Sequence, residues 1–454
     1  MTTSAEIWTL GQHQVLNTKA PFNPRNRVID LARHSVATEL LWETRGQSGP
    51  LAFKLRVRGV NEHCDCAVDG VHGEVYASQS YVKWQIDDKS SIIAGRQLLA
   101  WGPAIYRLPS NPFYFDAGRT NLFRESSGLD AIQYATYHGD WSLFAAQVLG
   151  SGYVGGREGE NFNGSQIGST EFRRSTLLRA QYQHAATTLG TVVARQHHGS
   201  GFVGGYGAWS FEDGWLLWSE VGWGRRPWSL KAGPGNDLAL VVERPSRPMA
   251  TALLGASYTN DKAQTFQAEY LYDGHGLSHD ESDALAAVGS RVGSLLGGPR
   301  TGQALNTLFE GARYAPVSTN RHYLAFSWQG TAQRERLLGR VTWYGNLVDA
   351  SHRTSFYVEY AFSRRVSGLL SLVSRHGSDV VGCAQPSERS ARRIARPIPS
   401  VLASDATPRC ASMASADRQM IGDATLVLDK GRSDDEFGSQ LRRRFTAGLK
   451  YRLF

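Results

Sequence analysis

Apolar and polar residues alternate with a period of two along most of the chain, in segments of about 10 to 14 residues. Between 266 and 273, for example, Phe266, Tyr270 and Tyr272 fall on one face, and Glu269 and Asp273 fall on the other. This is the period of strands that bury one face. The predicted strands span 34–44, 50–62, 71–87, 90–102, 127–138, 141–152, 176–188, 190–200, 203–212, 215–225, 249–260, 263–273, 320–330, 334–346, 351–362, 365–376, 417–429 and 441–454.

The connections between these segments are of two kinds. Short polar turns, such as 87–89 and 260–262, alternate with long segments at 103–126, 154–175, 227–248, 275–320 and 378–416. Short turns on one side and long loops on the other are typical of outer-membrane barrels. The strand length agrees, since a tilted membrane strand needs about 9–11 residues and soluble strands usually have about 5–6. The pattern predicts an all-β protein, a single antiparallel transmembrane β-barrel of about 18 strands with long extracellular loops.

The exact strand number stays open, within an even range of 16–20. With both termini periplasmic, the predicted segments put the long loops on the periplasmic side, and extra strands near 5–14 and 394–403 would restore the usual sides. We therefore divide the chain into 1–33, either a first strand or an arm in the lumen or periplasm, and a barrel over 34–454. A soluble β-sandwich or propeller is the alternative, but it accounts only for the alternation.

Several further features favour a bacterial outer-membrane location. No stretch approaches 18 consecutive apolar residues, so the chain does not cross a membrane as helices. The last ten residues form an amphipathic strand ending in Phe454, which resembles the C-terminal assembly signal of outer-membrane barrels. The start, Met1-Thr-Thr-Ser, has neither a basic nor an apolar region, so we expect a mature form without its signal peptide. Tryptophans expected to form the interfacial girdles are Trp84, Trp101, Trp141, Trp215, Trp223 and Trp343.

One part of the sequence resembles known families. It comprises the strand end at 92–102 with Gly-Arg-Gln and Trp-Gly, the Asn-Pro loop at 109–113, and the Arg/Gly/Asp-Ala strand start at 123–131. This region resembles large outer-membrane barrels of the DUF1302-type and alginate-export porin-like families. The resemblance implies a barrel class rather than a particular solute, and no functional residue is carried over from it.

The 103–126 connection is a candidate constriction. Pro103, Pro109 and Pro112 remove backbone donors and stiffen it, which suits a loop folded into the lumen. Its basic residues Arg107, Arg119 and Arg124 would then line the passage. The alternative is a surface loop that only shields the barrel mouth.

Charged residues on the polar side of the strands should face a wet lumen, because a charge facing lipid is costly. A net-basic wall favours anions, whereas a ladder of Arg–Glu pairs would only keep the barrel rigid; both readings remain open. The Arg392-Arg393 and 442–444 arginine runs suit lipopolysaccharide or phosphate contacts. The candidate wall residues are Arg56, Arg58, Lys83, Arg179, Arg195, Glu269, Arg340 and Glu359, and Glu220 is a further acidic partner on that side.

The four cysteines allow a disulfide in an oxidising compartment. Cys383 and Cys410 bracket the long 378–416 loop and are the candidate pair. Cys64 and Cys66 lie near His72, but we favour disulfide bonding over a metal site there, and expect no metal or cofactor.

Catalysis is not expected. The two candidate segments are 197–200, with two histidines and a serine, and 273–280, with histidines beside aspartates. Alternation puts His197 and His198 on opposite faces, and the second segment has no oxyanion-hole signature. Both fit polar loops better.

The 275–320 connection contains two predicted short helices, at 281–296 and 303–312. They would lie either as a plug over or in the lumen, or at the membrane surface.

These features predict an outer-membrane channel or exporter that passes a polar, anionic solute or polysaccharide through a basic lumen. The alternative is a loop-plugged, non-conducting barrel that serves as a structural component or receptor in an envelope complex. The expected partners are membrane lipid and lipopolysaccharide, the anionic solute or polysaccharide, and envelope proteins; no nucleic-acid-binding motif is present.

Overall fold

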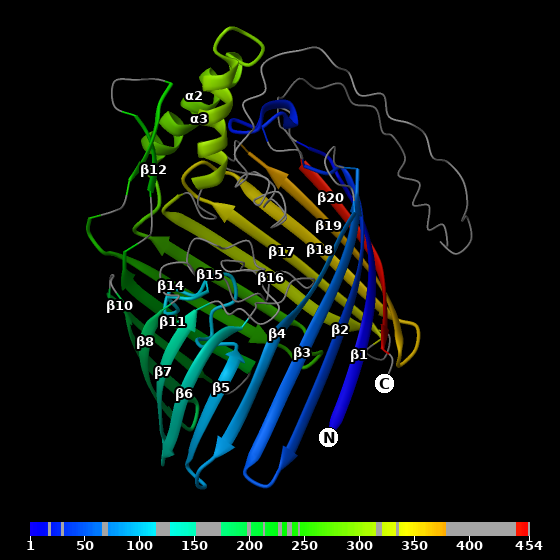
Figure 1. Cartoon of the computed structure of the whole chain (residues 1–454), viewed down its shortest axis with the longest axis vertical. Helices are drawn as coiled ribbons and strands as arrows, with labels where there is room; N and C mark the ends of the chain where they lie inside the picture. Colours follow the sequence, from blue (N-terminus) through cyan, green and yellow to red (C-terminus); the bar gives the residue numbers. More distant parts are fainter. Residues whose placement is uncertain are drawn as a thin grey trace.

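In a computed structural model, the chain forms an antiparallel sheet of 18 strands in which β1 pairs with β2 on one side and with β20 on the other, so the sheet closes into a barrel (Figure 1). The structure describes residues 1–16, 20–28, 31–65, 71–114, 128–150, 174–197, 201–211, 214–225, 229–233, 238–243, 246–314, 320–332, 336–377 and 442–452. The strands of the barrel are β1 (Thr2–Gln14), β2 (His34–Ser48), β3 (Leu51–Cys64), β4 (Val71–Gln85), β5 (Ser90–Gln97), β6 (Leu129–His138), β7 (Trp141–Gly150), β8 (Ser175–His184), β9 (Thr187–Gln196), β10 (Gly201–Ser210), β11 (Trp215–Gly224), β14 (Met249–Thr259), β15 (Thr265–Asp273), β16 (His322–Ala332), β17 (Leu337–Asn346), β18 (His352–Ala361), β19 (Val366–His376) and β20 (Arg442–Arg452).

The predicted barrel is confirmed, and the question of its sides is resolved by the N-terminal strand. β1 belongs to the ring, so both termini lie at the end that carries the short turns, as Figure 1 shows. The long connections then lie at the other end. The predicted strands at 417–429 and 394–403 fall outside the described residues, and the ring is complete without them, because β19 pairs directly with β20.

The outer face of the barrel carries an apolar belt between aromatic residues. On β11, Leu217 and Val221 are exposed, while the alternating Trp218 and Glu220 are buried toward the interior. Among the described residues, no helix is long and apolar enough to cross a membrane. Exposed apolar side chains of the same outward register include Leu40, Phe53, Val82, Ile132, Leu143, Leu178, Val193, Val203, Leu254, Phe326, Phe356, Val358 and Leu370.

The predicted aromatic girdle is confirmed at Trp84, Trp141, Trp215 and Trp223, each about half exposed near a strand end. Trp101 was wrongly placed in it. β5 ends at Gln97 rather than at 102, and Trp101 is buried in the segment that follows. Gly95 has a φ of +121°, and a Cβ there would lie 2.3 Å from the carbonyl oxygen of Ser80, so the strand is irregular just before it ends.

A small cap projects beyond the long-loop end of the barrel (Figure 1). It consists of the β12–β13 hairpin (Ser229–Ala232 and Leu240–Glu243), the helices α2 (His279–Ser294) and α3 (Thr301–Tyr314), and residues near the 3₁₀ turn η1 (Pro24–Asn26). Both helices were predicted. Figure 1 shows both beyond the end of the barrel rather than in the lumen. The cap has an apolar core of its own, which contains Phe22, Leu230, Leu277, Leu285, Val288, Val292, Ala304 and Leu308.

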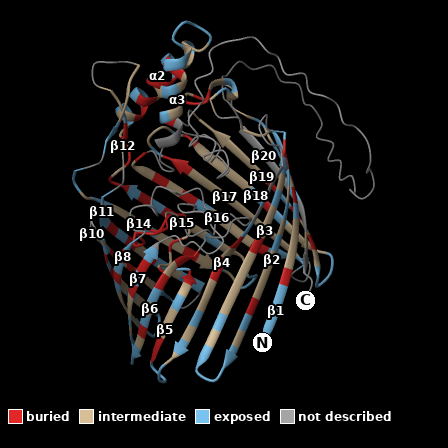
Figure 2. Cartoon of the chain, viewed as in Figure 1, coloured by how far each residue is buried: buried red, intermediate tan, exposed pale blue. Residues whose placement is uncertain are grey.

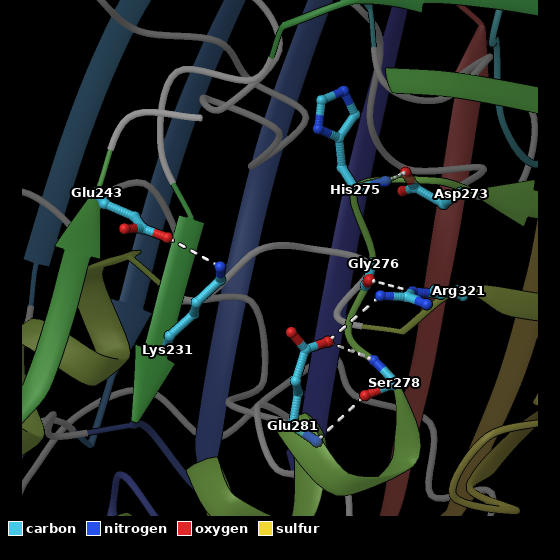
Figure 3. Close-up of polar contacts among 8 residues, drawn as sticks. All are labelled: Lys231, Glu243, Asp273, His275, Gly276, Ser278, Glu281 and Arg321. Atoms are coloured by element: carbon cyan, nitrogen blue, oxygen red, sulfur yellow. Dashed lines mark hydrogen bonds and ion pairs between the residues drawn. The ribbon is translucent and has the colours of Figure 1, made fainter. Parts of the chain in front are cut away.

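Polar contacts fix the part of the cap that follows β15 (Figure 3). Ser278 and Glu281 form a capping box at the start of α2. Arg321 donates from Nε to the carbonyl oxygen of Gly276 at 2.9 Å and lies 3.5 Å from a carboxylate oxygen of Glu281. Lys231 and Glu243 join the two strands of the hairpin at 2.8 Å. The connection before α2 is therefore tied to the start of β16.

Candidate functional site: an inserted loop and a charged wall

The segment after β5, residues 98–114, folds into the barrel as an internally bonded loop. The indole Nε1 of Trp101 donates to the carbonyl oxygen of Ser110 at 3.1 Å. Asn111 donates to the carbonyl oxygen of Leu99 and accepts from the backbone N–H of Phe113. Figure 2 colours much of this stretch as buried. Because these groups bond within the loop, its backbone can leave water without unpaired donors.

Two buried carboxylates on the inner face hold the loop. Glu220 on β11 accepts from the backbone N–H of Ala104 (2.9 Å) and from the N–H and hydroxyl of Ser110 (3.2 and 2.7 Å). Glu269 on β15 accepts from the backbone N–H groups of Ile105 (2.7 Å) and Tyr106 (3.0 Å), and from Nε1 of Trp218 (2.9 Å). The two glutamates are 0% and 2% exposed.

A buried carboxylate is tolerated only when hydrogen bonds replace its hydration. Each of these glutamates accepts three, most of them from the loop. The loop and the two carboxylates therefore stabilise each other, and losing either partner would leave buried polar groups unsatisfied, at a cost of about 1–3 kcal/mol each.

Glycines on the neighbouring strands allow the loop backbone to approach closely. A Cβ at Gly222 would lie 1.9 Å from the carbonyl oxygen of Pro109, and one at Gly204 would lie 2.5 Å from that of Ser110. Only the absence of a side chain at these two positions leaves room for the loop.

The loop also buries apolar surface against the same wall. Trp101, Leu108 and Phe113 join a cluster with inner-face residues of β6 to β16, among them Val148 and Leu253. Arg179 on β8 lies over the ring of Phe144, with its guanidinium carbon 3.8 Å from the centroid, and 5.5 Å from the centroid of Trp101. This basic residue thus packs beneath the loop rather than lining open water.

The wall formed by β1 to β3 and β20 is different, because its inner charges pair with one another. Glu43 on β2 lies 2.5 Å from Arg45, 3.4 Å from Lys54 and 3.3 Å from Arg56. Similar pairs join Glu39 to Arg58 and Glu6 to Lys450. Several of these side chains keep 11–25% exposure, so this wall is partly wet.

At the end of the barrel that carries the long connections, two arginines lie directly opposite each other on neighbouring strands. Arg353 on β18 is the register partner of Arg375 on β19. Arg353 donates from Nε to Ser355 Oγ at 3.3 Å, and among the described residues neither arginine forms an ion pair. Arg107 of the inserted loop also repels Arg353 electrostatically. The guanidinium carbon of Arg107 lies 5.7 Å from the centroid of the Tyr344 ring. The result is a cluster of positive charge between the loop and the wall.

The other predicted wall residues are distributed over several strands. Arg340 donates to the side-chain oxygen of Gln329, and Glu359 accepts from Tyr357 and Ser367. Lys83 shares the inner register of β4, since its neighbours Val82 and Trp84 are exposed. Arg119 and Arg124 lie outside the described residues.

Arg195 is not in the lumen. It is exposed on β9 and shares its register with exposed Leu189 and Val193, whereas Val192 and Ala194 are buried. β9 ends at Gln196, so Arg195 sits at the edge of the membrane belt, where a charged side chain can reach water.

Sequence reasoning missed Arg353 and Arg375 as site residues, and named Glu220 only as a wall carboxylate. Alternation places all three on the inner face, so a complete list of inward charges would have included the arginines. That Glu220 holds a loop is not a local signal, because its partners Ala104 and Ser110 are 116 and 110 positions away.

The cysteine and enzyme candidates are only partly covered by the described residues. Cys64 is disulfide-bonded, while Cys66, Cys383 and Cys410 lie outside them. In the 273–280 segment, Asp273 accepts from the backbone N–H of His275, and Ser278 caps α2, so these side chains shape a turn. His198 and Ser200 lie outside the described residues.

A closed antiparallel barrel with an apolar outer belt, aromatic girdles and a charged interior defines an outer-membrane β-barrel. No protein-family model and no curated protein matches the chain. Solved structures with a similar course of the chain include Acinetobacter baumannii OccAB1, with a TM-score of 0.49, 10% identity, and coverage of 100% of this chain and 96% of that one. Pseudomonas aeruginosa opdK gives a TM-score of 0.47 at 10% identity over 99% and 98% of the two chains. A mutant of Rh. blastica porin gives a TM-score of 0.42 at 9% identity over 100% and 99%.

Proposed function

We propose that this barrel is a passive outer-membrane channel for small polar anions, with loop 98–114 as its constriction. The passage would run between the loop and the charged wall, and positive charge beside the loop would set the selectivity. The clustered charge would attract an anion, and conduction requires that the anion bind weakly enough to leave again.

The register pair of Arg353 and Arg375 carries this proposal. Like charges directly opposite each other on neighbouring strands destabilise a sheet, and no carboxylate offsets these two among the described residues. On the wall of β1 to β3 and β20, by contrast, arginines and lysines have glutamate partners. An unfavourable pair that lies beside a constriction fits a requirement for positive charge on the passage.

A substitution of both arginines tests the proposal. The reversal potential of single channels is measured in a planar bilayer under a KCl gradient, for the wild type and for R353Q/R375Q. We expect chloride preference in the wild type. Removing one unit charge about 4 Å from a passing ion changes its energy by about 1 kcal/mol in water, so the double variant should lose most of that preference.

Cation preference in the wild type would contradict the proposal. A selectivity that is unchanged in R353Q/R375Q would also contradict it, because the two arginines would then not act on the passing ion. Heat-modifiable gel mobility shows in each case that the barrel is folded.

The kind of solute is inferred from the sequence resemblance. The resemblance of 92–131 to the DUF1302-type and alginate-export families supports a polyanionic polysaccharide as one cargo within this proposal. The test compares how strongly a series of oligosaccharide anions and neutral oligosaccharides of equal length block the current. Block by the neutral series alone would contradict a polyanionic polysaccharide as the cargo.

A plugged scaffold or receptor is the second candidate, and the apolar packing beneath the loop favours it. Trp101, Phe113 and Leu108 fill the space along one wall, and the cap lies beyond the same mouth (Figure 1). A folded barrel that stays silent in the bilayer would favour this candidate over the channel.

A further inference from the structure

Two pairs of histidines lie on the outer face of the barrel at its long-loop end. His13 of β1 is the register partner of His34 of β2, and His352 of β18 is the partner of His376 of β19. Side chains of directly opposed residues on antiparallel strands stand about 4.5–5.5 Å apart at Cβ, so each pair can act together. Nothing in the channel mechanism uses either pair.

The two Nδ1 atoms of the first pair lie within hydrogen-bond distance of each other. Nδ1 of His13 lies 3.1 Å from Nδ1 of His34, the ring centroids are 4.5 Å apart, and both side chains are exposed. Two bonds of about 2.0–2.1 Å from these nitrogens to a shared ion would meet at roughly 100°. That angle suits adjacent positions of a tetragonal or tetrahedral metal ion.

A hydrogen-bonded carboxylate, that of Asp65, lies beside this pair. Oδ1 of Asp65 accepts from the backbone N–H groups of Arg33 and His34 at 2.8 and 3.0 Å. Its charge would partly offset that of a bound cation. Within the described parts of the chain, no three His, Cys, Asp or Glu side chains converge on a metal position, so the ion would have two protein ligands and water for the rest.

We propose that His13 and His34 form a surface site for a late first-row divalent metal ion, with Cu²⁺ as the best fit. Imidazole nitrogens favour Zn²⁺, Ni²⁺ and Cu²⁺, and Cu²⁺ binds a given nitrogen site most tightly and accepts a tetragonal set completed by water. The site is independent of the proposed channel, since it lies on the outer face.

His352 and His376 provide the matched control. Their ring centroids are 5.0 Å apart at 34°, and His352 also packs against Trp343 at 6.1 Å. Both histidines of this pair are partly buried, whereas the first pair is exposed and has its Nδ1 atoms 3.1 Å apart. The same residue type on the same face thus occurs with and without the geometry of a site.

The experiment titrates Cu²⁺ into the folded full-length barrel in detergent and follows affinity by calorimetry and bound nitrogens by electron paramagnetic resonance. We expect a tightest site of one Cu²⁺ per chain with two nitrogen ligands. H34Q should weaken it by roughly tenfold or more and remove one nitrogen from the spectrum, and H13Q should do the same. H376Q should leave both readouts unchanged.

Equal affinity in wild type and H34Q would overturn the proposal, because the tightest site would then lie elsewhere. A loss on H376Q equal to that on H34Q would also overturn it, since histidine content rather than the Nδ1 geometry would then govern binding. Using two exposed positions, His13 and His34, guards against a single variant that fails to fold.

Discussion

The two walls of the lumen satisfy buried charge by different means. On the wall that includes β11 and β15, Glu220 and Glu269 accept backbone N–H groups from an inserted loop. On the wall of β1 to β3, Glu39 and Glu43 meet arginines and lysines of the neighbouring strand. The same alternation of strand residues produces both.

The difference shows that an inward glutamate can have two structural roles. Where its partners are backbone groups of a distant segment, it fixes the position of that segment. Where its partners are side chains on the next strand, it lowers the net charge of the wall. In the proposed channel, the first arrangement would set the width of the passage, and the second would contribute to its field.

The largest change in conductance is expected when a side chain fills the space that the loop occupies. Gly222→Ala would place a Cβ 1.9 Å from the carbonyl oxygen of Pro109, and overpacking of this kind costs about 1–3 kcal/mol. We expect the loop to shift from the wall and single-channel conductance to rise. Gly73→Ala is the control, because a Cβ there meets nothing within 4 Å. Equal conductance in the two folded variants would mean that the loop does not limit the current.

A smaller effect is expected from the charged wall. Glu43→Gln leaves Arg45, Lys54 and Arg56 without their shared carboxylate. One unit charge about 4 Å from an ion is worth about 1 kcal/mol in water, or roughly a fivefold change in the ratio of chloride to potassium permeability. Reversal potentials should therefore shift toward anions while conductance stays similar.

Glu243→Gln makes the same charge change in the cap hairpin, where the partner is Lys231. It should leave the reversal potential unchanged. A shift of equal size in both variants would show that overall charge, rather than the lumen wall, sets the selectivity.

The smallest effect concerns the cap, which is held by local contacts. Ser278→Ala removes the capping box of α2 and should cost that helix about 1 kcal/mol, seen as faster amide hydrogen exchange in α2 with the barrel strands unaffected. Ser294→Ala at the other end of the helix removes only a bond to the carbonyl oxygen of Arg291, and should change exchange much less. Faster exchange in the barrel strands as well would show that the cap does not fold independently.

The same cap contact gives a pH dependence. The backbone N–H of Ser278 donates to Glu281 and lowers the pKa of that carboxyl, although its partial burial acts in the opposite sense. A lowered pKa in the folded state stabilises the helix start above the ordinary carboxyl pKa, and this stabilisation is lost as pH falls through the lowered value. The protection of α2 amides, taken as their exchange rate relative to that of an unfolded chain at the same pH, should therefore fall in acid, and Glu281→Gln should remove that acid dependence.

The strands and their inward faces were predictable from sequence, because alternation is a local consequence of one apolar and one polar side. β1 was the uncertain strand, and its inclusion decided which end carries the long loops. Trp101 was misplaced because β5 ends earlier than alternation alone indicates. Arg195 was misplaced because it shares the register of exposed Val193 rather than that of buried Val192 and Ala194.

The arrangement of the site was less accessible. Pro103, Pro109 and Pro112 correctly suggested a loop in the lumen, but its anchors lie more than a hundred positions away. Gly204 and Gly222 carry no visible signal in a strand sequence until the loop is seen to pass over them. Alternation also could not separate Arg179, which packs beneath the loop, from arginines that face water.

Two carboxylates hold loop 98–114 in place, and in the proposed channel this loop narrows the passage. The most direct test is the single-channel conductance of E220Q/E269Q beside the wild type in the same bilayer, with folding shown by heat-modifiable mobility. An amide keeps the shape of each side chain but turns a donor toward the loop's N–H groups, so the account predicts a released loop and a larger conductance. An unchanged conductance in the folded double variant would contradict it.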